Sequence, residues 1–233
     1  MRLGKTISVV GLLLALTGSQ LASISLAQET TLHTNPARDI NLQRFAFSVN
    51  LVDAALERLK HKVTYDGSYR KIAFPDGDVP NHIGVCTDVI VRSYRKLGID
   101  LQERVHRDML NSFAQYPNLA KWDRVRPDTN IDHRRVLNLR VFFERNGASL
   151  PISSNSNDYL PGDMVTWDIM PGMPHIGIIT DKISKDKTRP LVVHNMGKGP
   201  KLEDILFTMK ITGHYRYQPG LQFNPALNHQ AQF

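Results

Sequence analysis

The pattern of apolar residues divides the chain into a helical first half and a strand-rich second half. From about residue 48 to Val63, apolar side chains recur every three or four positions, which predicts a helix that begins at Ser48 or Asn50. Three more helices show this periodicity, and each is followed by a glycine or proline that ends it: about 86–97, 102–116 and 133–145. Asp132 is expected to cap the last of them.

After Pro151 the pattern changes to short apolar runs separated by glycine, proline and polar residues. Valine, isoleucine and aromatic residues are common in these runs, as is typical of strands. Four strands are predicted, at 164–167, 175–180, 191–195 and 211–217. Helices followed by a meandering antiparallel sheet indicate the α+β fold class.

The N-terminus, residues 1–27, has the features of a secretory signal peptide. A short basic region is followed by an apolar run too short to span a bilayer, and then by small residues up to Ala27. We expect cleavage after Ala27 and a periplasmic or secreted protein; the alternative is an uncleaved membrane anchor. The rest of the chain is interpreted as a tether at 28–44, a single domain at 45–220 and a loose tail at 221–233.

Charge and cysteine content indicate which partners the protein could bind and what stabilises its core. The formal net charge is +7, which suits attraction to an acidic polymer or surface. The chain has no long run of lysine and arginine and no known binding motif, which argues against nucleic acid as a partner. The single cysteine, Cys86, excludes an internal disulfide, so we expect burial alone to hold the core together. An unpaired thiol in an exported chain is a candidate reactive group.

Cys86 lies where a tight turn runs into the second predicted helix. At the first or second position of a helix, unpaired backbone N–H groups and the helix dipole favour the thiolate over the thiol. The sequence therefore predicts a nucleophile with a lowered pKa. The alternative is a small buried apolar residue, which describes most free cysteines.

Two histidines lie where the partners of a thiolate would be needed. His175 begins the second predicted strand, and His194 lies near the end of the third. Because the start of one antiparallel strand lies beside the end of its neighbour, the two rings are expected to be adjacent. We assign His175 as the base and His194 as the group that orients it. Asn195 is the alternative orienting group, although its side chain is expected on the opposite face of the strand.

A zinc site made of His82, Cys86, His175 and His194 is the competing interpretation. However, His82 lies in a loop, and no helix places it on the same side as Cys86. We therefore expect no metal and no cofactor.

Two sequence segments contain the candidate nucleophile and the candidate base, in this order along the chain. Gly84-Val85-Cys86-Thr87-Asp88 leads into an amphipathic helix, and Pro161-Gly162-Asp163 is followed by His175-Ile176-Gly177-Ile178. These segments resemble the two signatures of the NlpC-type cell-wall cysteine peptidases, over about residues 65–217. The resemblance is strongest to a bacterial family of that clan known only as a domain of unknown function. It implies a papain-like fold with Cys86, His175 and His194 as catalytic residues, and cleavage of an amide bond in peptidoglycan, in a stem peptide or at the sugar–peptide junction.

The chain departs from the family pattern in two places. Val85 stands where many relatives have aspartate, and Thr87-Asp88 stands where they have serine and glycine. Two helices, at about 102–116 and 133–146, are inserted between the nucleophile and the base. These departures bear on substrate choice more than on reaction type.

Three further side chains are candidates for supporting or substrate-binding roles. The backbone N–H of Cys86 is expected in the oxyanion hole. The resemblance implies an added tyrosine hydroxyl, from Tyr65 or Tyr69, and ordinary packing is the alternative for both. Asp88 either binds a substrate amine or is an acid favoured in the first helical turn by the dipole.

The sequence leads to one main hypothesis, an exported cysteine peptidase or amidase that acts on peptidoglycan. One alternative is a non-catalytic wall-binding module on the same fold, suggested by the basic charge and the unusual residues around Cys86. Another is an acyl or peptidyl transferase that uses the same residues. No stable membrane insertion is expected after signal cleavage, and the sequence gives no signal of an oligomeric state.

Overall fold

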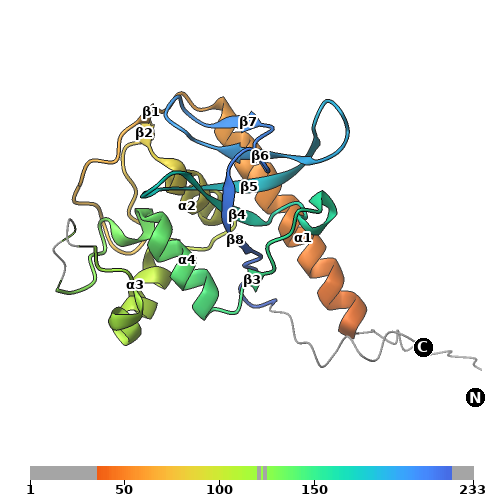
Figure 1. Ribbon diagram of the computed structural model, residues 1–233. Coiled ribbons are helices and arrows are strands. Elements are labelled where there is room, and N and C mark those ends of the chain that lie inside the picture. The colour runs from red at the N-terminus through yellow and green to blue at the C-terminus, as the bar shows by residue number, and fades with distance from the viewer. Residues whose placement is uncertain (1–35, 120–121, 123–124, 222–233) are drawn as a thin grey trace, which may run out of the picture. The chain divides into compact units, whose positions relative to one another are not determined.

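The computed structural model describes residues 36–119, 122 and 125–221 (Figure 1). The predicted signal peptide at 1–27 and residues 222–233 of the predicted tail lie outside the described residues. Within the described part of the chain, no helix is both long enough and apolar enough to cross a membrane.

Helix α1, Pro36–Glu57, begins well before the predicted start at Ser48 or Asn50. Proline fits the first turn because the N–H that it lacks has no partner within the helix. The buried residues of α1 lie only toward its end, so its first half has no apolar face that periodicity detects. Residues 36–44, which were assigned to the tether, are therefore helical, and that prediction is wrong.

Helix α2, Cys86–Lys96, forms as predicted. Its first nine residues are all buried, and the chain leaves the helix through Gly98, whose φ of +75° suits glycine. Two short strands, β1 (Thr64–Tyr65) and β2 (Ile83–Gly84), precede α2 and pair in parallel. They were not predicted, because two residues are too few to show alternation.

Helices α3 (Leu101–Ser112) and α4 (Val136–Arg145) form the segment inserted between the candidate nucleophile and base. Asp100 caps α3 with its side chain. The predicted cap at Asp132 is wrong, because this residue lies in a 3-10 turn and its carboxylate accepts a hydrogen bond from the N–H of Asp128 at 2.7 Å. Short 3-10 turns are η1 (Arg58–Lys60), η2 (Phe113–Gln115), η4 (Asp132–Arg134) and η5 (Ser156–Asp158).

The second half of the chain forms a six-stranded sheet with the order β3-β8-β4-β5-β6-β7 (Figure 1). Every pairing in it is antiparallel, which confirms the α+β class with an antiparallel sheet. The predicted strands correspond to β4, β5, β6 and β8, whereas the short edge strands β3 and β7 were not predicted. The strands are β3 (Ser149–Leu150), β4 (Met164–Met170), β5 (Met173–Ile183), β6 (Pro190–His194), β7 (Lys201–Glu203) and β8 (Lys210–Tyr215).

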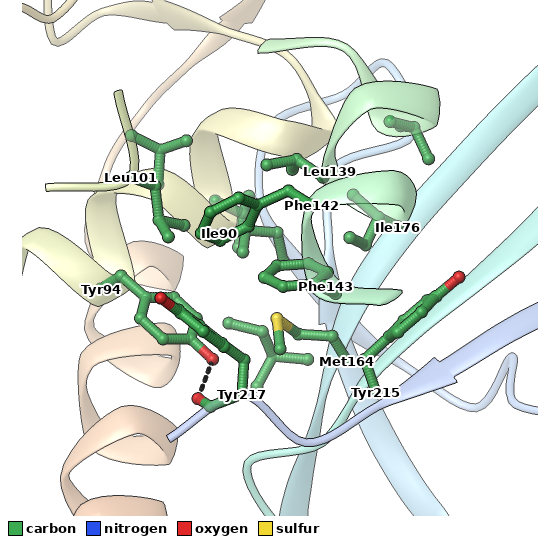
Figure 2. Packing of buried hydrophobic residues seen from close by; sticks show 14 of the residues in the cluster. Ile90, Tyr94, Leu101, Leu139, Phe142, Phe143, Met164, Ile176, Tyr215 and Tyr217 are labelled. Carbon is green, nitrogen blue, oxygen red and sulfur yellow. Dashed lines mark hydrogen bonds between the residues drawn. The ribbon is translucent and has the colours of Figure 1, made fainter. Parts of the chain in front are cut away.

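Aromatic and aliphatic side chains join α2 and α4 to one face of the sheet (Figure 2). Ile90 and Tyr94 of α2 lie in this cluster with Ile176 of β5. The Tyr94 hydroxyl donates a hydrogen bond to the carbonyl oxygen of Tyr217 at 2.7 Å, so its polar atom is satisfied inside the core. A smaller cluster around Trp167 is built from the alternate strand positions and lies on the other face.

Asp163 gives the Pro-Gly-Asp segment a structural role. Its carboxylate is fully buried and accepts a hydrogen bond from Nε of Arg216 at 2.7 Å. It also lies 2.8 Å from Nε2 of His214, whose Nδ1 is 3.1 Å from the carbonyl oxygen of Pro151. Asp163 thus ties the start of β4 to the end of β8.

Gly177 has no room for a side chain between β5 and β6. An added Cβ would lie 2.6 Å from Cγ1 of Val192 and 3.0 Å from the carbonyl oxygen of Val193. We predict that Gly177→Ala lowers the free energy of unfolding, measured in urea, by about 1–3 kcal/mol, the usual cost of overpacking. Gly67→Ala is the control, because a Cβ there makes an ordinary contact at 3.4 Å. Unchanged stability of Gly177→Ala would contradict this close approach of the two strands.

Candidate functional site

A buried carboxylate fixes the start of helix α2. Oδ2 of Asp88 accepts a hydrogen bond from the backbone N–H of Val85 at 2.6 Å. The guanidinium group of Arg134 binds both oxygens of the same carboxylate, each at 2.9 Å. These contacts favour the interpretation of Asp88 as a first-turn acid over a substrate-binding residue. They stabilise the turn that presents Cys86.

Cys86 is the first residue of α2 and is 5% exposed. The backbone N–H groups of Ile176 and Thr87 and the hydroxyl of Tyr65 lie near its sulfur, and each acts to lower the pKa of the thiol. Burial raises the pKa of the Cys86 thiol to about 11, so the predicted lowering of this pKa is wrong for the resting protein. A charge at a helix end is worth about 0.3–1 kcal/mol, less than the roughly 1.4 kcal/mol of one pKa unit, so burial outweighs the dipole.

His175 and His194 form a buried pair, which confirms their predicted adjacency. Nε2 of His175 lies 3.0 Å from Nδ1 of His194, and the ring planes are nearly perpendicular, at 89°. Gly177 pairs with His194 across the two strands, and the side chains of Val192 and His194 occupy the space where a Cβ of residue 177 would lie. Burial, and then the neighbouring His194, lowers the pKa of His175 to about 3, so this ring is neutral in the resting protein.

The histidine pair and Cys86 approach β5 from different faces. The ring of His175 lies on the face that carries Trp167, with 6.0 Å between the ring centroids. Ile176 points to the opposite face and packs in one cluster with Cys86. The sulfur meets β5 through the backbone N–H of Ile176, the residue next to His175. The sulfur and the His175 ring are thus both adjacent to the beginning of β5.

Glu203 is a further polar residue at the pair, and it was not predicted. Its Oε2 lies 3.0 Å from Nε2 of His194, within ion-pair distance, but this buried nitrogen has no partner that meets hydrogen-bond geometry. Burial lowers the pKa of His194, and Glu203 acts in the opposite direction. The sequence holds little signal for this residue, because β7 has only three residues and shows no clear alternation.

The two candidate tyrosines have different surroundings. The Tyr65 hydroxyl lies near the sulfur and the backbone N–H of Cys86, and both affect its pKa. Burial, and then the neighbouring Cys86, raises the pKa of Tyr65, so its hydroxyl stays protonated. Tyr69 is exposed, and its hydroxyl accepts a hydrogen bond from Nδ2 of Asn130 at 3.0 Å. Tyr65 is therefore the tyrosine that lies at the candidate nucleophile.

Asn195 supports the turn before α2. Its Nδ2 donates to the carbonyl oxygen of Gly84 at 3.5 Å, and its Oδ1 accepts from the N–H of Gly197 at 3.2 Å. Neither contact involves His175, whose ring partner is His194. His194 thus has the position of the orienting group, and Asn195 does not.

The competing zinc interpretation finds no support in the residues that the structure describes. Among them, no three histidine, cysteine, aspartate or glutamate side chains are grouped so as to hold a metal ion. His82 is exposed, whereas Cys86 is buried.

The candidate residues are closed off from solvent. His175 is 1% exposed and His194 is fully buried. A groove of about 650 Å³, lined mainly by α1, contains neither of them nor Cys86. Access of a solute to the sulfur therefore requires side chains over it to move. Tyr65, which contacts the sulfur and is half-exposed, is the first candidate for such a movement.

The raised pKa of Cys86 predicts slow alkylation at neutral pH, because only the thiolate reacts with iodoacetamide. In the folded protein the rate should rise about tenfold per pH unit between pH 6 and 9. At pH 7 it should be more than about tenfold slower than in urea, where the thiol regains a pKa near ~8.5. The mass of the adduct is measured over time. Equal rates for folded and unfolded protein at pH 7 would rule out a buried, protonated thiol.

Two comparisons with known proteins agree with each other. The uncharacterized protein YijF of Escherichia coli (strain K12) is 42% identical over 203 residues, which make up 85% of this chain and 98% of the relative. A family described as "Domain of unknown function (DUF1287)" matches residues 52–217, which include Cys86, His175, His194 and Glu203. Neither comparison connects this family with the NlpC-type peptidases. The chain belongs to the DUF1287 family.

Proposed function

We propose that this protein is an exported cysteine hydrolase that cleaves an amide bond in peptidoglycan, in a stem peptide or at the sugar–peptide junction. One observation carries the proposal. The only cysteine of the chain begins a helix, and its sulfur contacts the strand residue that follows His175, itself paired with His194. The resemblance of two ordered segments to the NlpC-type signatures supports the choice of substrate.

The reaction uses Cys86 as nucleophile and His175 as proton carrier. The thiol gives its proton to His175 as the sulfur attacks the amide carbonyl carbon. His175 then donates this proton to the leaving amine, the C–N bond breaks, and a thioester on Cys86 remains. Water gives a proton to His175 and attacks the thioester, which releases the carboxylic acid and restores the thiol. The cycle balances without a cofactor.

In the resting protein, the Cys86 thiol and the His175 imidazole are both uncharged. A thiol with a raised pKa and an imidazole with a lowered pKa exchange no proton at neutral pH. The ion pair therefore forms only during the attack, and His194 supports it by accepting a hydrogen bond from the imidazolium. This is general-base catalysis, in which the proton moves as the new bond forms.

The oxyanion hole is assigned to the backbone N–H of Cys86 and the hydroxyl of Tyr65. The hydroxyl already lies at this N–H and at the sulfur, which are the two positions that a bound carbonyl has to approach. Loss of one such donor typically costs about 10²–10³ in kcat. Tyr69 receives no role, because its hydroxyl is bound to Asn130.

A papain-like fold and export complete the proposal. A helix with cysteine at its N-terminus, packed on an antiparallel sheet that carries the histidines, fits the arrangement that the resemblance implies. Residues 1–27 would direct the chain to the periplasm or the exterior, where peptidoglycan lies. The formal net charge of +7 suits contact with an acidic wall polymer.

The buried, protonated thiol favours one other function, a non-catalytic module that binds the cell wall. In that case Cys86 is a small core residue and the basic charge supplies the affinity. An acyl or peptidyl transferase is a variant of the main proposal, in which an amine takes the place of water. It uses the same residues and differs in its products.

The test is digestion of purified sacculi with residues 28–233, followed by mass spectrometry of the soluble fragments. Wild type should release fragments. Cys86→Ser keeps the size of the side chain but is a weaker nucleophile, so it should release them at least about 10³-fold more slowly. His175→Ala should lose a similar factor, whereas His82→Ala, which changes an exposed histidine, should match wild type.

Three outcomes separate the candidate functions. Release by Cys86→Ser at the wild-type rate would refute the cysteine hydrolase. No release by folded wild type, together with co-sedimentation with sacculi, would establish the binding module instead. Fragments joined to an added amine would identify the transferase.

A further inference from the structure

We propose that Glu203 is a positioning residue that selects the ring nitrogen with which His175 takes the proton of Cys86. The inference rests on the function proposed above and deepens it. It gives a role to a side chain outside the cysteine and the two histidines. Glu203 acts through His194 and touches neither substrate nor sulfur.

Glu203, His194 and His175 form a line across the neighbouring strands β7, β6 and β5. Oε2 of Glu203 lies 3.0 Å from Nε2 of His194, and Nδ1 of His194 lies 3.0 Å from Nε2 of His175. The register places all three side chains on one face of the sheet, because Val192 pairs with Glu203 and Gly177 pairs with His194. Both nitrogens of His194 are thus in contact with a neighbour.

This line fixes the tautomers of both rings. An ionised carboxylate only accepts hydrogen bonds, so Glu203 favours a neutral His194 with its hydrogen on Nε2. Nδ1 of His194 is then an acceptor, and Nε2 of His175 has to carry a hydrogen to donate to it. Nδ1 of His175 is left without a hydrogen. That nitrogen is the one free to receive the proton of Cys86.

Because His194 is buried, the carboxylate of Glu203 has a strong effect on the tautomer of its ring. His194 is fully buried, and Nε2 is out of reach of solvent. The reverse tautomer would turn the lone pair of Nε2 toward the negatively charged Oε2 of Glu203, 3.0 Å away, and the two would repel each other. No water screens this repulsion at the buried nitrogen, so the tautomer follows the charge at Glu203.

The charges around the pair leave it neutral at rest. Burial is the main influence on the pKa of His194 and lowers it. Glu203 acts to raise the pKa of His194. Lys201, whose Nζ lies 3.8 Å from Oε1 of Glu203, acts to lower it. On the β5 side, His194 contributes to the lowered pKa of His175. The choice of tautomer matters in this neutral state, because each ring then has a single hydrogen.

Glu203→Gln tests the inference, with Glu57→Gln as a matched control. The two glutamate side chains are similarly exposed, at 41% and 43%, and Glu57 lies on α1, where it forms an ion pair with the surface residue Lys96. NMR of the histidine ring nitrogens gives the tautomer of each ring without any need for activity. We expect Nε2–H on both rings in wild type and in Glu57→Gln.

The amide of Glu203→Gln is able to donate a hydrogen bond to Nε2 of His194, which the carboxylate is not. We therefore expect this variant to gain a population with the hydrogen on Nδ1 of His194, and hence on Nδ1 of His175. In that population Nδ1 of His175 already carries a hydrogen, so it cannot accept the proton of Cys86. In sacculi digestion, kcat should fall about 10–100-fold, the range typical of groups that orient a reacting ligand, and KM should stay within about twofold.

The outcomes distinguish this inference from the proposed function. Unchanged tautomers in Glu203→Gln, with kcat within twofold of wild type, would overturn the role of Glu203 and leave the hydrolase standing. Changed tautomers in a protein whose wild type releases no fragments would support the action of Glu203 on His194 and refute the hydrolase. Changed tautomers together with a lowered kcat support both.

Discussion

The packing of helix α2 on strand β5 is the constraint on which the candidate site depends. The buried face of α2 sets its depth on the sheet, and the ion pair between Asp88 and Arg134 sets where the helix begins. Together they hold the sulfur of Cys86 at the backbone of Ile176. Removal of one partner of a buried ion pair typically costs about 3–5 kcal/mol, so the position of the helix start is strongly determined.

The same burial that places the groups also keeps them inactive at rest. It raises the pKa of the Cys86 thiol, lowers that of the His175 imidazole and shuts out solvent. In such a site, hydrogen bonds and charges act over a low dielectric and have large effects. The hydroxyl of Tyr65 and the carboxylate of Glu203 are the polar groups at the two ends of this arrangement, and both are partly exposed. In the proposed reaction, a substrate therefore approaches this buried centre through Tyr65 or Glu203.

Long periodic elements could be predicted from the sequence, and short ones could not. Helix α2 repeats its apolar residues with the helical period and is followed by Gly98, and the strands that carry the two histidines hold runs of valine, leucine and isoleucine. Strand β7 offers three residues, so Glu203 gave no signal. The pKa of Cys86 was mispredicted for a different reason. The prediction from the helix start considers only the local backbone, whereas the burial of Cys86 comes from residues far away in the sequence, such as Ile176 and Val193 of the same apolar cluster.

The proposed reaction requires a covalent bond between the Cys86 sulfur and the acyl part of the substrate. Peptide mapping by mass spectrometry detects this bond after wild type has been mixed with soluble peptidoglycan fragments and quenched in acid during turnover. We expect the peptide containing Cys86 to gain the mass of the acyl part of the substrate and to lose it on treatment with hydroxylamine, as a thioester does. Substrate cleavage with this peptide at its unmodified mass at every time point would rule out a thioester on Cys86.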